Sequence, residues 1–333
     1  MEKNILFYLV VHIGCEIITE YFILEVIISL LKDKELYEKY SNTYTFHFIP
    51  LLNPEGYIIS TSNVLKNTLN LNQKELEKLA TEYLIAYDQD DYLSMQGKCL
   101  DKKYKKVLKS SLLNIENSLL RKSVKNILKK CNLNEDVLPI WSANGKGIDI
   151  NSNSIHRFKE IKALRKSQKF GPLRYNDIKT TIPSPMSFTG VATFEKRVPE
   201  NLGLYKYIKE IYNLKDDTNE SLLAIFSYHS TGGEIYGFCD KEFADKSNIQ
   251  IQSLGMNEYS KYTNYSLVNE SLKYGVMDYY RVALSNVCSL TIELSKKNAN
   301  PIGFLSNIES FLNEIRDNKK ALLNTIDKLN STY

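Results

Sequence analysis

Continuous apolar runs separated by amphipathic stretches dominate the pattern of hydrophobic and polar positions. Ile5 to Val11 is one such run, and after a Gly-containing turn the apolar spacing predicts a helix from about Glu16 to Leu31. Tyr44 to Leu52 has another buried-strand pattern and ends in the turn signal Asn53-Pro54-Glu55-Gly56. Two strands with a helix between them predict a right-handed βαβ unit.

The second half of the chain repeats this alternation. We expect a helix over Leu204 to Ile211, buried strands over Leu222 to Tyr228 and Val287 to Leu294, and a terminal helix from Leu305 to about Leu329. The central apolar runs lack a period of two, which is typical of strands covered on both faces. The sequence therefore predicts an α/β fold, a mixed twisted sheet flanked by helices, in a single domain spanning residues 1–333.

Residues 63–134 differ in composition from the remainder of the chain. Lys, Asn, Leu and Glu recur there at helical spacing, so we expect a helical basic insertion. Between Lys98 and Lys130 there are eleven Lys or Arg residues against only Asp101 and Glu116. Such a run is either a solvated helix face or a contact for an anionic surface or polymer, for example in a cell wall. The net charge of +4 for the whole chain is too small to imply nucleic acid by itself.

The composition narrows the class of protein further. With 43% hydrophobic and 25% charged residues, the 333-residue chain resembles ordinary globular proteins and excludes disorder, collagen and coiled coil as descriptions of the whole. The five cysteines are widely spaced without a C-x-x-C pair, which argues against a disulfide scaffold and a zinc ribbon.

The first residues allow two interpretations. Met1 to Cys15 has a charged start, an apolar run and a Gly-Cys, which resembles a short lipoprotein signal. A core strand has the same pattern, and the helix predicted from Glu16 continues directly after it. Without a convincing signal peptide we expect a cytoplasmic location, and a lipid-anchored or wall-associated protein is the alternative.

Several common catalytic motifs are absent: there is no P-loop, no G-x-G-x-x-G, no G-x-S-x-G and no H-E-x-x-H. The remaining candidates are polar residues where predicted strands end, since open α/β sheets place ligands at that edge. They are His12, Glu16, Asn53 to Gly56, Asp149, Asn151 and His229. Glu293 lies inside the last predicted strand, where an ionised carboxylate is costly unless it is paired, protonated or bound to a metal.

Four blocks occur in the order seen in zinc carboxypeptidases, the funnelin family of metallopeptidases. They are Phe48 to Tyr57 (FIPLLNPEGY), Trp141 to Asn151 (WSANGKGIDIN), Ser227 to Tyr236 (SYHSTGGEIY) and Thr291 to Leu294 (TIEL). The second block, the G-G-E-I-Y of the third and Asn300-Pro301 are most similar to the bacterial γ-D-glutamyl-diamino acid endopeptidases, which cut peptidoglycan stem peptides. The resemblance implies the fold and proteolysis of this hydrolase family.

The resemblance also implies roles for individual residues. In the family a His and a Glu of an H-x-x-E motif, with a later His, bind one zinc ion, and a Glu near the end is the general base. Glu16 and His229 then match metal ligands, Glu293 the catalytic base, Asn151 a substrate-binding residue and Tyr265 a mobile catalytic tyrosine. Three protein ligands leave zinc an open position for water, whose proton a carboxylate can take.

Two departures from the family pattern leave enzymatic activity open. The position three before Glu16 is Ile13, and His12 stands one residue too early, so this ligand either reaches the metal through a bulge at Gly14 or is lost. The arginine that pairs with Asn151 is replaced by Ser152, although Lys146, Arg157 or Arg165 are available as substitutes. Relatives also carry several tens of residues before the first strand.

Two functions follow from these residues. One is a metal-dependent peptide hydrolase, acting on peptides such as peptidoglycan stem peptides, with an impaired zinc site. The other is a catalytically inactive pseudoenzyme that binds peptide or cell wall.

Overall fold

The computed structural model describes most of the secondary structure that the sequence predicts. The described residues are 4–11, 14–68, 72, 74–75, 111–151, 153, 182–185, 188, 190, 198–213, 222–237, 246–268, 280, 284, 286–296 and 308–332.

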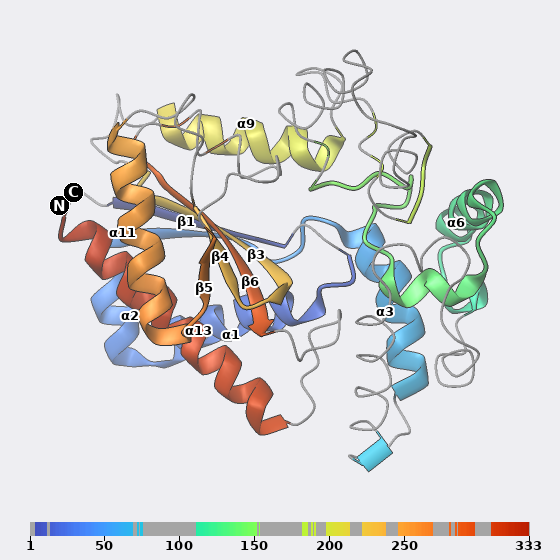
Figure 1. Cartoon of the computed structure of the whole chain (residues 1–333), viewed down its shortest axis with the longest axis horizontal. Helices are drawn as coiled ribbons and strands as arrows, with labels where there is room; N and C mark the ends of the chain where they lie inside the picture. Colours follow the sequence, from blue (N-terminus) through green and yellow to red (C-terminus); the bar gives the residue numbers. More distant parts are fainter. Residues whose placement is uncertain are drawn as a thin grey trace.

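Six strands form one mixed, twisted sheet in the order β2-β1-β3-β6-β4-β5 (Figure 1). The strands are β1 (Asn4–Val11), β2 (Tyr44–Ile49), β3 (Ala224–Gly232), β4 (Glu234–Tyr236), β5 (Ser266–Val268) and β6 (Cys288–Lys296). Only the pairing of β4 with β6 is antiparallel among the described strands. The predicted α/β class and mixed sheet are confirmed.

Helices cover both faces of this sheet (Figure 1). On one face lie α1 (Ile17–Lys32), α2 (Lys34–Ser41), α11 (Lys246–Thr263) and α13 (Ile308–Asn330), and on the other lies α9 (Pro199–Asn213). Helices α3 (Pro54–Thr68) and α6 (Ser118–Cys131) stand beside the sheet with the short 3-10 turns η2 (Leu112–Asn114) and η3 (Glu135–Ile140). Among the described residues, none of the helices is long and apolar enough to cross a membrane.

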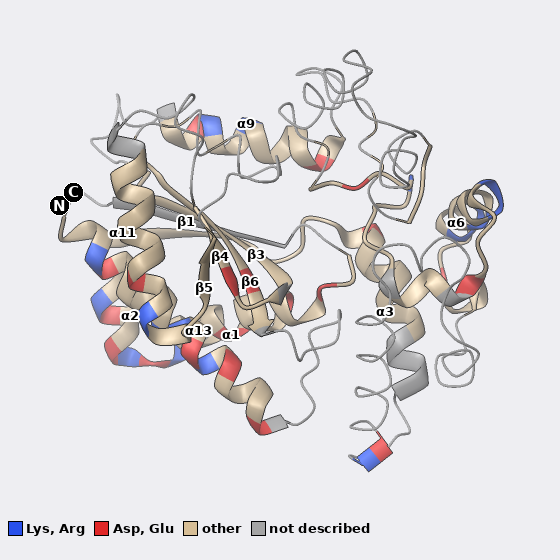
Figure 2. Ribbon diagram, in the orientation of Figure 1, with Lys and Arg blue, Asp and Glu red and all other residues tan. Residues whose placement is uncertain are grey.

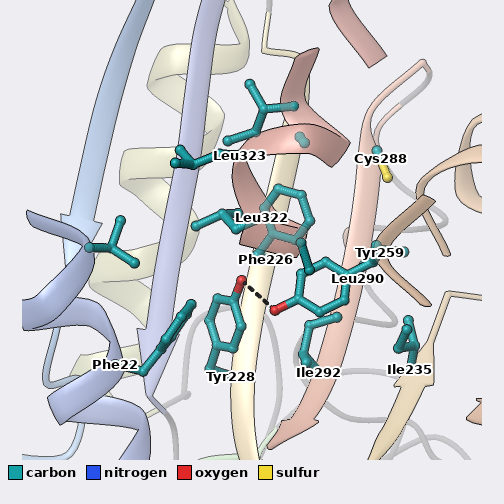
Figure 3. Packing of buried hydrophobic residues seen from close by; sticks show 14 of the residues in the cluster. Phe22, Phe226, Tyr228, Ile235, Tyr259, Cys288, Leu290, Ile292, Leu322 and Leu323 are labelled. Carbon is teal, nitrogen blue, oxygen red and sulfur yellow. Dashed lines mark hydrogen bonds between the residues drawn. The ribbon is translucent and has the colours of Figure 1, made fainter. Parts of the chain in front are cut away.

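The main core lies between the sheet and the helices α1, α11 and α13 (Figure 3). Phe226 and Tyr228 of β3 and Leu290 and Ile292 of β6 are fully buried there. The one polar contact drawn in this core joins the hydroxyls of Tyr259 and Tyr228, 3.3 Å apart. Because buried hydroxyls need partners, the pair satisfies both tyrosines inside the apolar layer.

A second cluster, centred on Trp141, joins α3, α6, η2 and η3. The side chains of Val124, Ile127 and Leu128 are buried in it, at the spacing that places them on one face of α6. The opposite face of α6 is therefore turned to solvent.

One expectation about local structure is wrong. Asn53-Pro54-Glu55-Gly56, expected as a turn, begins α3: Asn53 Oδ1 accepts a hydrogen bond from the backbone N–H of Gly56, 3.0 Å away, and Pro54 takes the first helical position. The helical region consequently starts before residue 63. Gly14 does not adopt a positive φ. Its lack of a side chain is required instead by its contact with Gly56.

Candidate active site

The two central strands are apolar on one face and polar on the other. Tyr228 and Ile292 point into the main core, whereas Ser227 and His229 belong to the face that carries Thr291 and Glu293. The parallel register pairs Ser227 with Thr291 and His229 with Glu293, and paired residues project from the same face. The predicted metal ligand His229 and the predicted base Glu293 are thus neighbours across two strands.

Strand β4 adds two further polar groups to this face. Its antiparallel register places Glu234 opposite Glu293 and Tyr236 opposite Thr291. The hydroxyl of Tyr236 donates a hydrogen bond of 2.5 Å to Glu234, and burial together with this carboxylate raises the pKa of Tyr236. The polar face therefore extends over three strands, from β3 through β6 to β4.

Glu16 meets this face from the turn before α1. Its Oε2 atom lies 3.1 Å from Nδ1 of His229, and the two side chains are only 7% and 2% exposed. Among the described residues, no group donates a hydrogen bond to this buried Oε2. A carboxylate oxygen and an imidazole nitrogen thus converge in a buried position.

Two groups of β3 contact Glu16 and His229 and help to orient them. Ser227 Oγ lies 3.2 Å from Nε2 of His229, on the side of the ring that faces away from Glu16. The backbone N–H of Ser230 donates a hydrogen bond to Glu16. When Nε2 carries the proton that Ser227 accepts, Nδ1 is left with its lone pair towards Glu16.

Burial controls the charge state of the neighbouring groups. It raises the pKa of Glu16 well above that of an ordinary glutamate, and the nearby charge of Asp149 raises it further. Burial likewise raises the pKa of the Cys15 thiol to about 12, with a further contribution from Glu16. Cys15 is therefore protonated at neutral pH.

A tight junction of three loops fixes the position of Glu16. The backbone N–H of Gly14 donates to Ser142 O (3.3 Å), and Ser60 Oγ donates to Gly14 O (2.7 Å). Asn53 Nδ2 also donates to Ser142 O, 3.0 Å away. A Cβ atom on Gly14 would lie 2.4 Å from the backbone carbon of Gly56, so only glycine fits where the loops meet.

The block Trp141 to Asn151 forms a second organised loop. Asn144 Oδ1 accepts hydrogen bonds from the backbone N–H groups of Lys146 (3.0 Å) and Ile148 (3.1 Å). This arrangement leads directly to the buried Asp149 and to the half-buried Asn151, the predicted substrate-binding residue. Lys146 is exposed.

Tyr265 lies elsewhere, in the main core on the opposite face of the sheet. Its hydroxyl donates to Glu314 of α13 and accepts hydrogen bonds from Asn318 Nδ2 (2.9 Å) and Ser295 N (3.1 Å). The structure does not bring Tyr265 to Glu16 and His229, and its catalytic role stays a prediction.

The fit of these residues to a metal ion is partial. Glu16 Oε2 and His229 Nδ1 present two suitable donors, and a buried carboxylate oxygen without a hydrogen bond is what a cation would satisfy. Within the described ranges, no group of three or more His, Cys, Asp or Glu side chains is placed to hold a metal. His12 and Ile13 lie outside the described residues, as do Ser152, His156, Arg157 and Arg165.

Through the family resemblance the sequence predicted Glu16 and His229 as ligands and Glu293 as the base, and the structure places these three residues together, but sequence reasoning missed three polar partners. Ser227 could have been found, because it is a polar residue in an otherwise apolar strand and stands two positions before His229, on the same face. Glu234 and Tyr236 were not assigned, since a three-residue strand is too short to show a pattern. His47 lies on β2 with its Nδ1 atom 2.7 Å from the hydroxyl of Tyr207.

Comparison with known proteins identifies the fold. The sequence profile of a family described as zinc carboxypeptidase matches residues 2–321. Bovine thrombin-activatable fibrinolysis inhibitor, solved in complex with tick carboxypeptidase inhibitor, is 15% identical with a TM-score of 0.52, over 99% of this chain and 82% of that one. Carboxypeptidase A from Helicoverpa armigera is 13% identical with a TM-score of 0.53, over 98% of this chain and 61% of that one. No curated protein sequence matches the chain.

Proposed function

Because the chain belongs to the zinc carboxypeptidase family, whose members use zinc and act on peptides, we propose that it binds peptides at the polar face of β3 and β6 and hydrolyses them slowly, through an impaired zinc site. One observation carries this proposal: the buried pair Glu16 and His229 lies on the same face as Glu293. Those are the residue types that metal-assisted peptide hydrolysis needs.

The described residues have separable tasks in this reaction. Glu16 and His229 would hold the metal, and Ser227, by accepting the proton of Nε2, would favour the tautomer of His229 in which Nδ1 can bind it. Zinc, when bound, supplies a polarised water and a Lewis acid for the peptide carbonyl. Glu293 takes the proton of the attacking water, and Asn151 binds the substrate carboxylate.

Impairment follows from the ligand count. A catalytic zinc site takes three protein ligands, and Glu16 with His229 supplies two. The third depends on His12, which stands one residue before the family position occupied by Ile13. One residue of extended chain is about 3.3 Å, far more than the roughly 0.2 Å tolerance of a metal bond. We therefore expect weak zinc binding.

The substrate we propose is a γ-D-glutamyl-diamino acid peptide of the kind found in peptidoglycan stems. The support is the similarity of WSANGKGIDIN, GGEIY and Asn300-Pro301 to the endopeptidases that cut such peptides. A second candidate is a peptide-binding or wall-binding module without catalysis, which Ile13 and Ser152 favour, since both replace residues of the family site.

Zinc content and hydrolysis test the proposal together. Zinc retained after dialysis is measured in the wild type, His229→Ala, His12→Ala and, as a matched control, His47→Ala. We expect less than one zinc per chain, lost in His229→Ala and unchanged in His47→Ala. Hydrolysis of a γ-D-glutamyl-diaminopimelate peptide should be slow and abolished in Glu293→Gln.

Three outcomes distinguish the alternatives. Stoichiometric zinc that disappears in His12→Ala, with fast hydrolysis that disappears in Glu293→Gln, establishes a complete metallopeptidase and overturns the impaired site. Peptide binding that Glu293→Gln leaves unchanged, without hydrolysis by the wild type, establishes the binding module. Absence of both binding and hydrolysis contradicts both candidates.

A further inference from the structure

Helix α6 carries a basic face (Figure 2). Lys122, Lys125, Lys129 and Lys130 are all exposed, and none of them forms an ion pair with a described residue. The helix itself contains no acidic residue, and the nearest described one in the chain is the exposed Glu116. The described part of the chain therefore leaves a concentrated positive charge on this face.

The buried side of α6 fixes the direction of this face. Val124, Ile127 and Leu128 are packed in the cluster around Trp141, so the helix cannot rotate without exposing them. At 100° per residue, Lys122, Lys125 and Lys129 fall within one sector of the helix opposite to that cluster. The lysines consequently form a stable surface.

Helix stability explains only some of these lysines. Lys129 and Lys130 lie in the last turn, where a positive charge interacts favourably with the helix dipole. Lys122 and Lys125 lie outside that turn, so the helix dipole does not stabilise their charges. Their positions are instead consistent with contact to an anionic partner outside the chain.

Two exposed leucines indicate which class of anionic partner this face fits. Leu119 is 79% exposed and lies three residues before Lys122, so the two side chains are neighbours on the surface of α6, and Leu113 is 76% exposed in the adjoining η2. They are the most exposed large hydrophobic side chains among the described residues. A soluble or wall-bound polyanion needs only the lysines, whereas a lipid surface takes up both the charge and the apolar side chains.

We propose that the lysine face of α6, together with Leu119 and Leu113, docks the protein on an anionic lipid bilayer. The lysines contact the phosphate headgroups, and the two leucines enter the boundary between headgroups and acyl chains. The attachment lies on the edge of the molecule beyond α3, away from β6, the strand that contains Glu293 (Figure 1). It is therefore independent of whether the protein hydrolyses peptides.

Vesicle co-sedimentation of the full chain at low salt tests this surface. We expect binding to vesicles of phosphatidylglycerol and phosphatidylcholine in equal parts, and much weaker binding to phosphatidylcholine alone. Each lysine near an anionic surface changes affinity roughly fivefold, so Lys122→Gln with Lys125→Gln should weaken binding on the order of 25-fold. The matched control is Lys206→Gln with Lys209→Gln, two exposed lysines of α9, which should change it less than about twofold.

Leu119→Ser separates a bilayer from a soluble polyanion. Its side chain is exposed, so the fold is preserved, and circular dichroism checks this for every variant. Binding to the mixed vesicles should fall about tenfold, because the apolar contribution is lost. Unchanged binding of Leu119→Ser, equal loss in the α9 control, stronger binding to soluble poly(glycerol phosphate) than to vesicles, or no vesicle binding would each overturn the proposal.

Discussion

Gly14 and Gly56 touch backbone to backbone, and this contact sets the distance between the loop that carries Glu16 and the start of α3. A Cβ atom on Gly14 would lie 2.4 Å from the carbonyl carbon of Gly56 and 2.6 Å from its Cα atom. Because both obstacles are backbone atoms, the loops must separate to accept any side chain there.

We therefore predict that Gly14→Ala lowers the free energy of unfolding by about 2 kcal/mol or more, since overpacking of this kind forces backbone shifts. Urea denaturation measures the change. The control is Gly203→Ala on α9, where no atom lies within 4 Å of the added Cβ. That substitution should stabilise the protein by roughly 0.5–1 kcal/mol, because alanine has the higher helix propensity. A Gly14→Ala variant as stable as Gly203→Ala would contradict the close contact.

Tyr265→Phe tests whether this tyrosine is structural. Removing the hydroxyl takes one hydrogen bond from each of Glu314, Asn318 and Ser295 N, which stay hydrogen-bonded to one another, so the free energy of unfolding should fall by about 1 kcal/mol. Peptide binding per folded molecule should not change. A loss of turnover with unaltered stability would instead assign Tyr265 the catalytic role that the sequence predicts. Tyr262→Phe, whose hydroxyl makes a longer contact of 3.4 Å with Glu258, is the comparison.

Glu314 should make stability depend on pH. Burial raises the pKa of Glu314 above the ordinary value of 4.5, so the folded protein holds this proton more tightly than the unfolded chain. The contribution of Glu314 to stability is therefore complete below pH 4.5 and decreases as the pH rises from there through the raised folded value. Thermal unfolding across this range should show a smaller decrease in Glu314→Gln. Glu309 is exposed, so Glu309→Gln should show the same pH dependence as the wild type. A Glu314→Gln profile identical to that of the wild type would refute the contribution of Glu314.

The single tryptophan reports on the cluster that contains α3 and α6. Trp141 is fully buried there, and its Nε1 atom donates to Asn144 O, 3.3 Å away. If the chain is a single domain, as the sequence predicts, tryptophan fluorescence and far-UV circular dichroism should show one coincident urea transition. A fluorescence transition at lower urea would show that this cluster unfolds separately.

The apolar runs predicted the central strands because burial on the main-core side requires them. The strand over Ala224–Gly232 and the strand over Cys288–Lys296 each fall within a few residues of their expected positions. Asn53 to Gly56 was misjudged because the same residue types begin helices and form turns. Helix α11 was not predicted, since its buried Ile251, Met256 and Tyr259 are interspersed with Ser, Asn and Gln.

The sequence likewise predicted some residues of the candidate site and not others. The family resemblance predicted that Glu16, His229 and Glu293 act together, but no local pattern shows that residues so far apart in the chain are in contact. Ser227 and Glu234 acquire their positions only through strand register, which single-sequence patterns do not specify. The third metal ligand remains a prediction that rests on His12.

The opposite characters of the two faces of β3 and β6 make the chemistry separable from the architecture. Tyr228 and Ile292 secure the helices on one side, whereas His229 and Glu293 project from the other and contribute nothing to that apolar layer. Substitutions among the polar residues can accumulate in a lineage while its scaffold remains intact. A protein built in this way can change its substrate, or exchange catalysis for recognition, without first having to find a new fold.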